Sequence, residues 1–160
     1  MPSEFIKRQS NDFYRDITSL GSLWIYCTIL LLFLLQKDYF IFKKLLAGLV
    51  LIQAIAIAIR TFYFKERPSR YPHKSYIERI DASSFPSLHS ARIAFLAAVF
   101  VGYFNNALFS ILFIGIALIV AYSRVYLKKH DYKDVLAGII IGILVYFTVN
   151  LIGLYFEFFH

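Results

Sequence analysis

Two histidines and one aspartate have the types and spacing of catalytic side chains. His130 and Asp134 are four positions apart, so on a helix they share one face. A carboxylate that accepts one imidazole N–H fixes the tautomer and raises the basicity of the other nitrogen. His89 follows Pro86-Ser87-Leu88 and precedes an apolar run, where the free N–H groups of a helix start would favour an anion. The three side chains are candidates for acid–base or nucleophilic chemistry on an anionic group.

Three arginines could bind a phosphate group beside these histidines. Arg60 and Arg67 are separated by six residues, and Arg124 precedes His130 by six positions. A guanidinium group stays charged and presents a planar set of N–H donors that matches phosphate oxygens. Nearby serines add hydroxyl groups. The candidate phosphate-binding residues are Arg60, Arg67, Ser87, Ser123 and Arg124.

The composition indicates a membrane protein. Of 160 residues, 59% are hydrophobic and 17% charged, whereas soluble domains have roughly 45–50% and about 25%. The single cysteine, Cys27, excludes a disulfide framework and a cysteine-rich zinc module. A net charge of +7 could suggest nucleic acid, but the long apolar runs favour a lipid bilayer instead. The expected partners are the bilayer and no nucleic acid, with no obligate protein partner evident.

Five apolar runs must position these residues. A span needs about 20 residues to cross about 30 Å of hydrocarbon. The first and fifth runs reach that length, the second and fourth reach it with their flanks, and the third is expected to start earlier, near residues 86–90. A soluble helical core is disfavoured because it would leave too little polar surface. We predict an all-α polytopic transmembrane bundle of about five spans, forming one domain over residues 1–160. The runs are 17–35, 45–59, 93–104, 107–122 and 135–156.

The N-terminal residues 1–16 show a different pattern. Phe5, Ile6, Phe13 and Ile17 fall near helical spacing beside basic residues. This pattern predicts an amphipathic helix that lies in the membrane interface and leads into the first run. The segment has no short cleavable apolar region typical of a signal peptide.

Alternation of the spans brings the candidate residues to one membrane face. The second run ends at Arg60, the third begins after His89, the fourth ends near Arg124, and the fifth begins after His130. This site face includes the long polar loop 60–92, and it holds 14 Lys/Arg against 8 Asp/Glu, a net +6, while the opposite face has +1. Such a bias marks the cytoplasmic side in many proteins, or it is a field that attracts an anion.

The three clusters, in this order, resemble the signature motifs of the type 2 phosphatidic acid phosphatase family. The family patterns are K-x6-R-P, P-S-G-H and S-R-x5-H-x3-D, and the resemblance covers residues 60–134. Two positions depart from them: Arg60 replaces the family lysine, and Leu88 replaces the glycine. Leu88 tolerates fewer backbone angles than glycine, which puts the geometry of this turn in question.

The resemblance implies a role for each residue. His130 would attack phosphorus and form a phosphohistidine, Asp134 would orient His130, and His89 would protonate the leaving oxygen and then activate water. The arginines and serines would hold the phosphate, and no metal or other cofactor would be required. A metal site on His130, Asp134 and His89 is disfavoured because three arginines would repel a cation.

The family also implies a substrate and a location. The expected substrate is a lipid phosphate or diphosphate: undecaprenyl diphosphate, phosphatidylglycerol phosphate, phosphatidic acid or the 1-phosphate of lipid A. The expected location is a bacterial-type inner membrane, with the site at the membrane–water interface and the outer, periplasmic face favoured. Two alternatives stay open: a relative that transfers the phosphate to another alcohol, and a non-catalytic protein that binds anionic lipid.

The sequence also allows expectations for the positions of two further basic residues, Lys65 and Arg92. We expect Lys65 to face solvent or lipid headgroups. Arg92, three residues after His89, either faces the site or pairs with Asp81 or Glu78.

Overall fold

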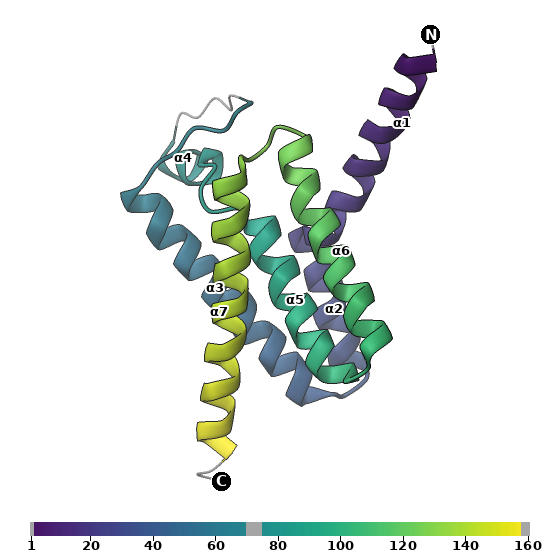
Figure 1. Cartoon of the computed structure of the whole chain (residues 1–160). Coiled ribbons are helices and arrows are strands. Elements are labelled where there is room, and N and C mark those ends of the chain that lie inside the picture. The colour runs from purple at the N-terminus through teal and green to yellow at the C-terminus, as the bar shows by residue number, and fades with distance from the viewer. Residues whose placement is uncertain (1, 70–74, 158–160) are drawn as a thin grey trace.

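The computed structural model describes residues 2–69 and 75–157, and over these residues it is all-helical, with no strand (Figure 1). The elements are α1 (Pro2–Ile17), the 3-10 turn η1 (Thr18–Gly21), α2 (Leu23–Leu35), α3 (Tyr39–Phe62), α4 (Tyr76–Ala82), α5 (Leu88–Phe104), α6 (Ala107–Tyr126) and α7 (Tyr132–Glu157). Each of the five predicted apolar runs contributes a helix to a transmembrane helical bundle.

Three helices of the described chain are long and apolar enough to cross a membrane by themselves: α3, α6 and α7. Residues 4–21 and α2 would form a fourth span if the bent pair counts as one. Helix α5 has 17 residues and falls short of that length. It begins at Leu88, which confirms that the third run starts before residue 93.

The first run is not one continuous helix, contrary to expectation. The chain turns by 47° between residues 4–21 and α2. Ser22 has an extended backbone, and its hydroxyl accepts the backbone N–H of Ile25 at 3.3 Å. A serine that caps a helix competes with continuation of the preceding one, so the polar residues of this run start a new helix.

The helices alternate in direction, as expected. Figure 1 shows the end of α3, the start of α5, the end of α6 and the start of α7 at the same end of the bundle, together with α4. Helix α7 runs to the opposite end. The candidate residues at these four helix ends therefore share one face of the molecule.

Helix α5 lies at the centre of the bundle and packs closely against α7. A Cβ atom added at Gly138 would lie 2.4 Å from the carbonyl oxygen of Ser87, and one at Gly142 would lie 2.3 Å from that of Ala91. Only glycine permits this approach, in the manner of small residues spaced four apart in membrane helices. The backbone N–H of Ser87 also donates to the Asp134 carbonyl at 3.0 Å. The starts of α5 and α7 are therefore held together.

Helix α1 extends beyond the bundle on the site face (Figure 1). The Tyr14 ring packs against the rings of Tyr122 and Tyr126 on α6, with centroids 5.6 and 4.2 Å away. Phe5, Ile6 and Phe13 remain exposed. The helix predicted for the N-terminus is present, and its position at a membrane interface remains a prediction.

The close contact of α5 and α7 can be tested with Gly142→Ala. The added methyl group would meet the Ala91 carbonyl, so we expect a loss of about 1–3 kcal/mol in unfolding free energy from overpacking. The measurement is thermal or denaturant unfolding in detergent. Gly115→Ala on α6 is the matched control, because its Cβ would meet no atom within 4 Å; it should be neutral or gain up to about 1 kcal/mol from helix propensity. Equal stability of the two variants would contradict the tight packing.

Candidate active site

His130 lies between α6 and α7 and is almost completely buried, with 3% of its surface exposed. Its Nδ1 atom lies 2.7 Å from the backbone carbonyl oxygen of Ser84. Because a carbonyl only accepts hydrogen bonds, we infer that Nδ1 carries the proton and donates it to Ser84. In the neutral imidazole this leaves the lone pair on Nε2, which is the atom that a nucleophile or base would use.

Asp134 is fully buried at the start of α7, one turn after His130. Its Oδ2 atom is 3.7 Å from Nδ1 of His130, which is too long for a hydrogen bond. The same oxygen accepts the hydroxyl of Ser84 and, at 3.1 Å, the backbone N–H of Asp131. In place of the direct hydrogen bond expected from the spacing, Ser84 connects the carboxylate with the imidazole.

Ser87 and His89 lie at the start of α5. Ser87 is the N-cap: its hydroxyl accepts the backbone N–H of Ser90 at 3.4 Å and the hydroxyl of Ser90 at 2.9 Å. Leu88 has no positive φ, and its side chain packs against the core. The leucine that replaces the family glycine is therefore accommodated without backbone strain, and its hydrophobic side chain joins α5 to the bundle.

Arg60 is buried at the end of α3 and binds backbone carbonyl groups. Its guanidinium donates to the carbonyl oxygens of Ile80 at 3.1 Å and Pro86 at 2.9 Å. A lysine could not make this two-pronged contact in the same geometry. The guanidinium ties the segment before α5 to α3, and among the described residues its buried Nε has no hydrogen-bond partner.

The other predicted arginines also enter the site region. Arg67 donates to the carbonyl of Asp81 at 2.6 Å, and Arg124 donates to the hydroxyl of Thr18 at 3.0 Å. Arg124 is buried, and its Nε likewise has no hydrogen-bond partner within the described part of the chain. The positive charges of both arginines act on His130.

Ser123 is the last of the predicted site residues, and the sequence leaves the position of Arg92 open. Arg92 is buried, and its Nε donates to the carbonyl of Leu88 at 3.2 Å. Its positive charge acts on His89 and also on Tyr26 of α2. Ser123 is buried, but its hydroxyl donates to the carbonyl of Val120 at 2.6 Å within α6. Its hydroxyl proton is thus already engaged.

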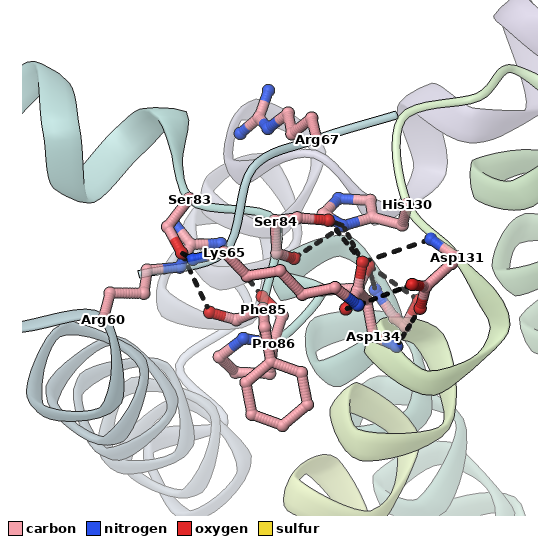
Figure 2. A network of polar contacts seen from close by, with 12 residues as sticks. Arg60, Lys65, Arg67, Ser83, Ser84, Phe85, Pro86, His130, Asp131 and Asp134 are labelled. Atoms are coloured by element: carbon pink, nitrogen blue, oxygen red, sulfur yellow. Dashed lines mark hydrogen bonds and ion pairs between the residues drawn. The ribbon is translucent and has the colours of Figure 1, made fainter. Parts of the chain in front are cut away.

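Three residues of this site were not predicted from the sequence: Lys65, Ser84 and Asp131. Figure 2 shows the Lys65 ammonium group between two carboxylates, 2.5 Å from Oδ2 of Asp131 and 2.6 Å from Oδ1 of Asp134. The expectation that Lys65 faces solvent or headgroups is therefore wrong. Lys65 lies inside the six-residue spacer of the first cluster, and Ser84 precedes the second, so only their proximity to motif residues could have drawn attention to them.

The pKa values in this group reflect competition between burial and pairing. Burial lowers the pKa of Lys65, but hydrogen bonds to the two carboxylates more than offset this effect and raise it overall. Burial likewise raises the pKa of Asp131, and the hydrogen bond from Lys65 more than reverses that, so the net direction is downward. Both shifts favour the charged forms, and the ion pair is therefore present at neutral pH.

The described residues contain no group of three His, Cys, Asp or Glu side chains that could hold a metal ion. Besides the Ser84 carbonyl and the Asp134 carboxylate on the Nδ1 side of His130, the polar groups near His130 and His89 are guanidinium groups, serine hydroxyl groups and backbone N–H groups. Such a set is suited to an anion with several oxygens, such as a phosphate. Two imidazole groups beside it allow nucleophilic attack and proton transfer from separate helix ends.

Comparisons with known proteins identify a family and two similar solved structures. A family model described as the PAP2 superfamily matches residues 41–157. The crystal structure of Aquifex aeolicus LpxE is similar with a TM-score of 0.73 and 22% identity, over 88% of this chain and 85% of that one. A PAP2-type phosphatidylglycerolphosphate phosphatase from Bacillus subtilis is similar with a TM-score of 0.73 and 25% identity, over 91% and 77%. No curated protein matches the chain significantly.

The charge state of His130 can be tested directly. Burial, aided by the positive charges of Arg124 and Arg67, lowers the pKa of His130 to about 3. The imidazole should therefore stay neutral from pH 8 to about pH 5, while a histidine in the unfolded chain titrates near 6.5. The unfolded chain therefore binds a proton at a higher pH than the folded protein does. As a result, His130 should lower the free energy of unfolding as the pH falls from about 6.5 towards about 3.

The measurement is an NMR titration of histidine-labelled protein in detergent, without substrate. The signal of His130 is assigned by its loss in His130→Ala. A titration midpoint near 6.5 would contradict the buried, neutral imidazole.

Proposed function

The chain belongs to the PAP2 superfamily and is a membrane lipid phosphatase, and we propose that it hydrolyses a lipid phosphate or diphosphate through a phosphohistidine on His130. The observation that carries the proposal is the hydrogen bond from Nδ1 of His130 to the Ser84 carbonyl. It leaves the Nε2 lone pair for attack, in a buried site where the positive charges of Arg67 and Arg124 act on the imidazole. A neutral imidazole beside two guanidinium groups meets the needs of phosphoryl transfer, which are positioning and neutralisation of charge.

In the first step, Nε2 of His130 attacks phosphorus and forms the N–P bond. The bond from phosphorus to the lipid oxygen breaks, and that oxygen takes a proton from His89 and leaves as an alcohol or, from a diphosphate, as the monophosphate. His89 is suited to this role because it comes from the start of α5, whereas the nucleophile comes from the loop before α7. Acid and nucleophile can thus approach the phosphorus from different sides.

In the second step, the now basic His89 takes a proton from water as the water oxygen attacks phosphorus. The N–P bond breaks, inorganic phosphate leaves, and both histidines return to their starting states. Asp134 would keep His130 oriented in both steps. The reaction is complete with water as the only co-substrate.

The arginines would hold the phosphate oxygens and offset the charge that develops during transfer. Arg60 and Arg124 each have a buried Nε–H that lacks a partner among the described residues, and buried donors of this kind are costly unless something accepts from them. A phosphate oxygen would be a suitable acceptor. With Arg67 and the N-terminus of α5 at Ser87, these donors supply a positive field, so we propose that no metal or other cofactor is required.

The proposed substrate is a phosphate carried by a membrane lipid. The site lies at the ends of apolar helices, where a lipid headgroup can reach it while the acyl or prenyl chains stay in the bilayer. The similar structures are an LpxE and a phosphatidylglycerolphosphate phosphatase. On this basis the candidates are lipid A 1-phosphate, phosphatidylglycerol phosphate, phosphatidic acid and undecaprenyl diphosphate, and comparison of their kcat/KM values would rank them.

The proposed location is a bacterial inner membrane with the site on the outer face. The positive charge of the site face favours the cytoplasm on simple counting. However, five of the 14 Lys/Arg residues on this face make contacts in or beside the site. Fewer positive charges are then left to act as a signal for cytoplasmic orientation. These five are Arg60, Lys65, Arg67, Arg92 and Arg124.

Phosphate release by the His130→Ala and His89→Ala variants tests the mechanism. We expect His130→Ala to lose at least about 1,000-fold in kcat, as for removal of a nucleophile, and His89→Ala about 100- to 10,000-fold. An alkaline quench with radiolabelled lipid phosphate should trap a phosphorylated protein in the wild type and none in His130→Ala. Lys133→Met, which changes an exposed lysine on α7, is the control. Undiminished release by both histidine variants would refute the mechanism, and loss of wild-type activity in EDTA would refute metal independence.

The orientation is tested by cysteine labelling in intact cells. In a Cys27→Ala background, Lys133→Cys reports on the site face and Lys43→Cys, an exposed position at the start of α3, on the opposite face. A membrane-impermeant maleimide should label the first and spare the second. The reverse pattern would place the site in the cytoplasm.

A further inference from the structure

Lys65, Ser84 and Asp134 form a closed ring of contacts around the position where His130 is held. The carbonyl of Lys65 accepts the backbone N–H of Ser84 at 2.7 Å, and the Ser84 hydroxyl donates to Asp134. The ring is closed by the Lys65 ammonium group, which lies 2.6 Å from Oδ1 of Asp134. Lys65 therefore binds Ser84 through its backbone carbonyl and Asp134 through its side chain (Figure 2).

The charge balance in this ring gives Lys65 a specific task. Asp134 is fully buried, and a buried carboxylate is costly unless a cation or several donors compensate it. Among the described residues, the other basic group within 4 Å of this carboxylate is the imidazole of His130, 3.7 Å away. A carboxylate that lacked Lys65 would raise the pKa of that imidazole and draw the Nδ1–H away from the Ser84 carbonyl.

We propose that Lys65 is a positioning residue of the active site, which holds the Asp134 carboxylate on the Ser84 hydroxyl and balances its charge, so that Nδ1 of His130 stays on the Ser84 carbonyl and Nε2 stays oriented for attack. The proposal rests on the proposed function, in which His130 is the nucleophile. It adds Lys65 and Ser84 to the machinery as residues that act through His130 and do not touch the substrate.

The geometry argues against a direct role of Lys65 in phosphate binding. An ammonium group has three N–H donors, and two of them are engaged by Asp131 and Asp134. Asp131 in turn accepts the backbone N–H of Asp134 at 3.1 Å. Lys65 thus lies on the carboxylate side of the network, and Asp131 fixes its ammonium group at the first turn of α7.

The charged and titratable groups near His130 come from four elements. The charged ones are Arg124 on α6, Arg67 on the segment after α3 and Asp134 on α7, and the titratable neighbour is His89 on α5. Asp134 is the one anion of this set. Through the charge of Asp134, Lys65 can therefore influence the pKa and orientation of the imidazole without contact to it.

Lys65→Met tests the proposal, because methionine keeps much of the stem and removes the charge. We expect kcat to fall about 10- to 100-fold, as for residues that orient a reactive group, while KM stays within about threefold. Lys65→Arg, which keeps the charge, should recover most of the loss. Lys133→Met, the exposed lysine one residue before Asp134, removes the same charge on the same face and should behave as the wild type.

The readout that a purely structural role would not move is the titration of His130 in the absence of substrate. In folded Lys65→Met the pKa of His130 should rise by at least about one unit, because the unpaired carboxylate favours the imidazolium. An unchanged His130 titration in folded Lys65→Met would overturn the proposal. Should Lys65→Met fail to fold, Ser84→Ala decides: it keeps both ion pairs but releases Oδ2 of Asp134 towards the imidazole, so the pKa should again rise, and no shift overturns the proposal.

The two proposals fail in different ways. Activity that survives in His130→Ala would refute the nucleophile, whereas the titration of His130 does not depend on turnover. Loss of activity in His130→Ala together with an unmoved titration in Lys65→Met would leave the proposed function intact and remove Lys65 from it.

Discussion

The close contact between α5 and α7 is the constraint on which the site depends. Gly138 and Gly142 let the α7 backbone approach the carbonyl oxygens of Ser87 and Ala91. The approach brings the cap of one helix beside the first turn of the other, where the Ser87 N–H donates to the Asp134 carbonyl. The start of α5, with His89, and the turn before α7, with His130, therefore lie at the same end of the bundle. Arg60 at the end of α3 and Arg124 near the end of α6 lie at this end too.

Much of the architecture follows from hydrophobicity alone. Apolar runs of sufficient length have few alternatives to helices in a membrane, because lipid offers no partners for backbone N–H and C=O groups. The same rule explains why the sequence predicts that α5 begins in the polar Pro86–Ser90 region and not at residue 93. The prediction of one continuous helix for the first run failed at Ser22, where the composition is apolar but a side-chain cap starts a new helix. A cap competes with the helix by a local hydrogen bond, which a count of apolar residues does not contain.

The motif residues of the site were predictable because their chemistry is carried by side-chain type and spacing. The partner of the His130 imidazole was not, because it is a backbone carbonyl, that of Ser84, and every residue has one. Lys65 and Asp131 were missed for another reason. They meet only when the segment after α3 lies against the turn before α7, and a lysine near a membrane face otherwise has the sequence context of a headgroup contact.

The short length of α5 makes access to the site dependent on the thickness of the bilayer. Its 17 residues rise about 26 Å at about 1.5 Å per residue, less than the about 30 Å of a typical hydrocarbon core. Helix α5, with Ser87 and His89 at its start, therefore spans a thick membrane only where the bilayer thins locally. Acyl-chain length and sterol or hopanoid content set the thickness of the bilayer, and they should therefore affect how readily a lipid headgroup reaches His89 and His130.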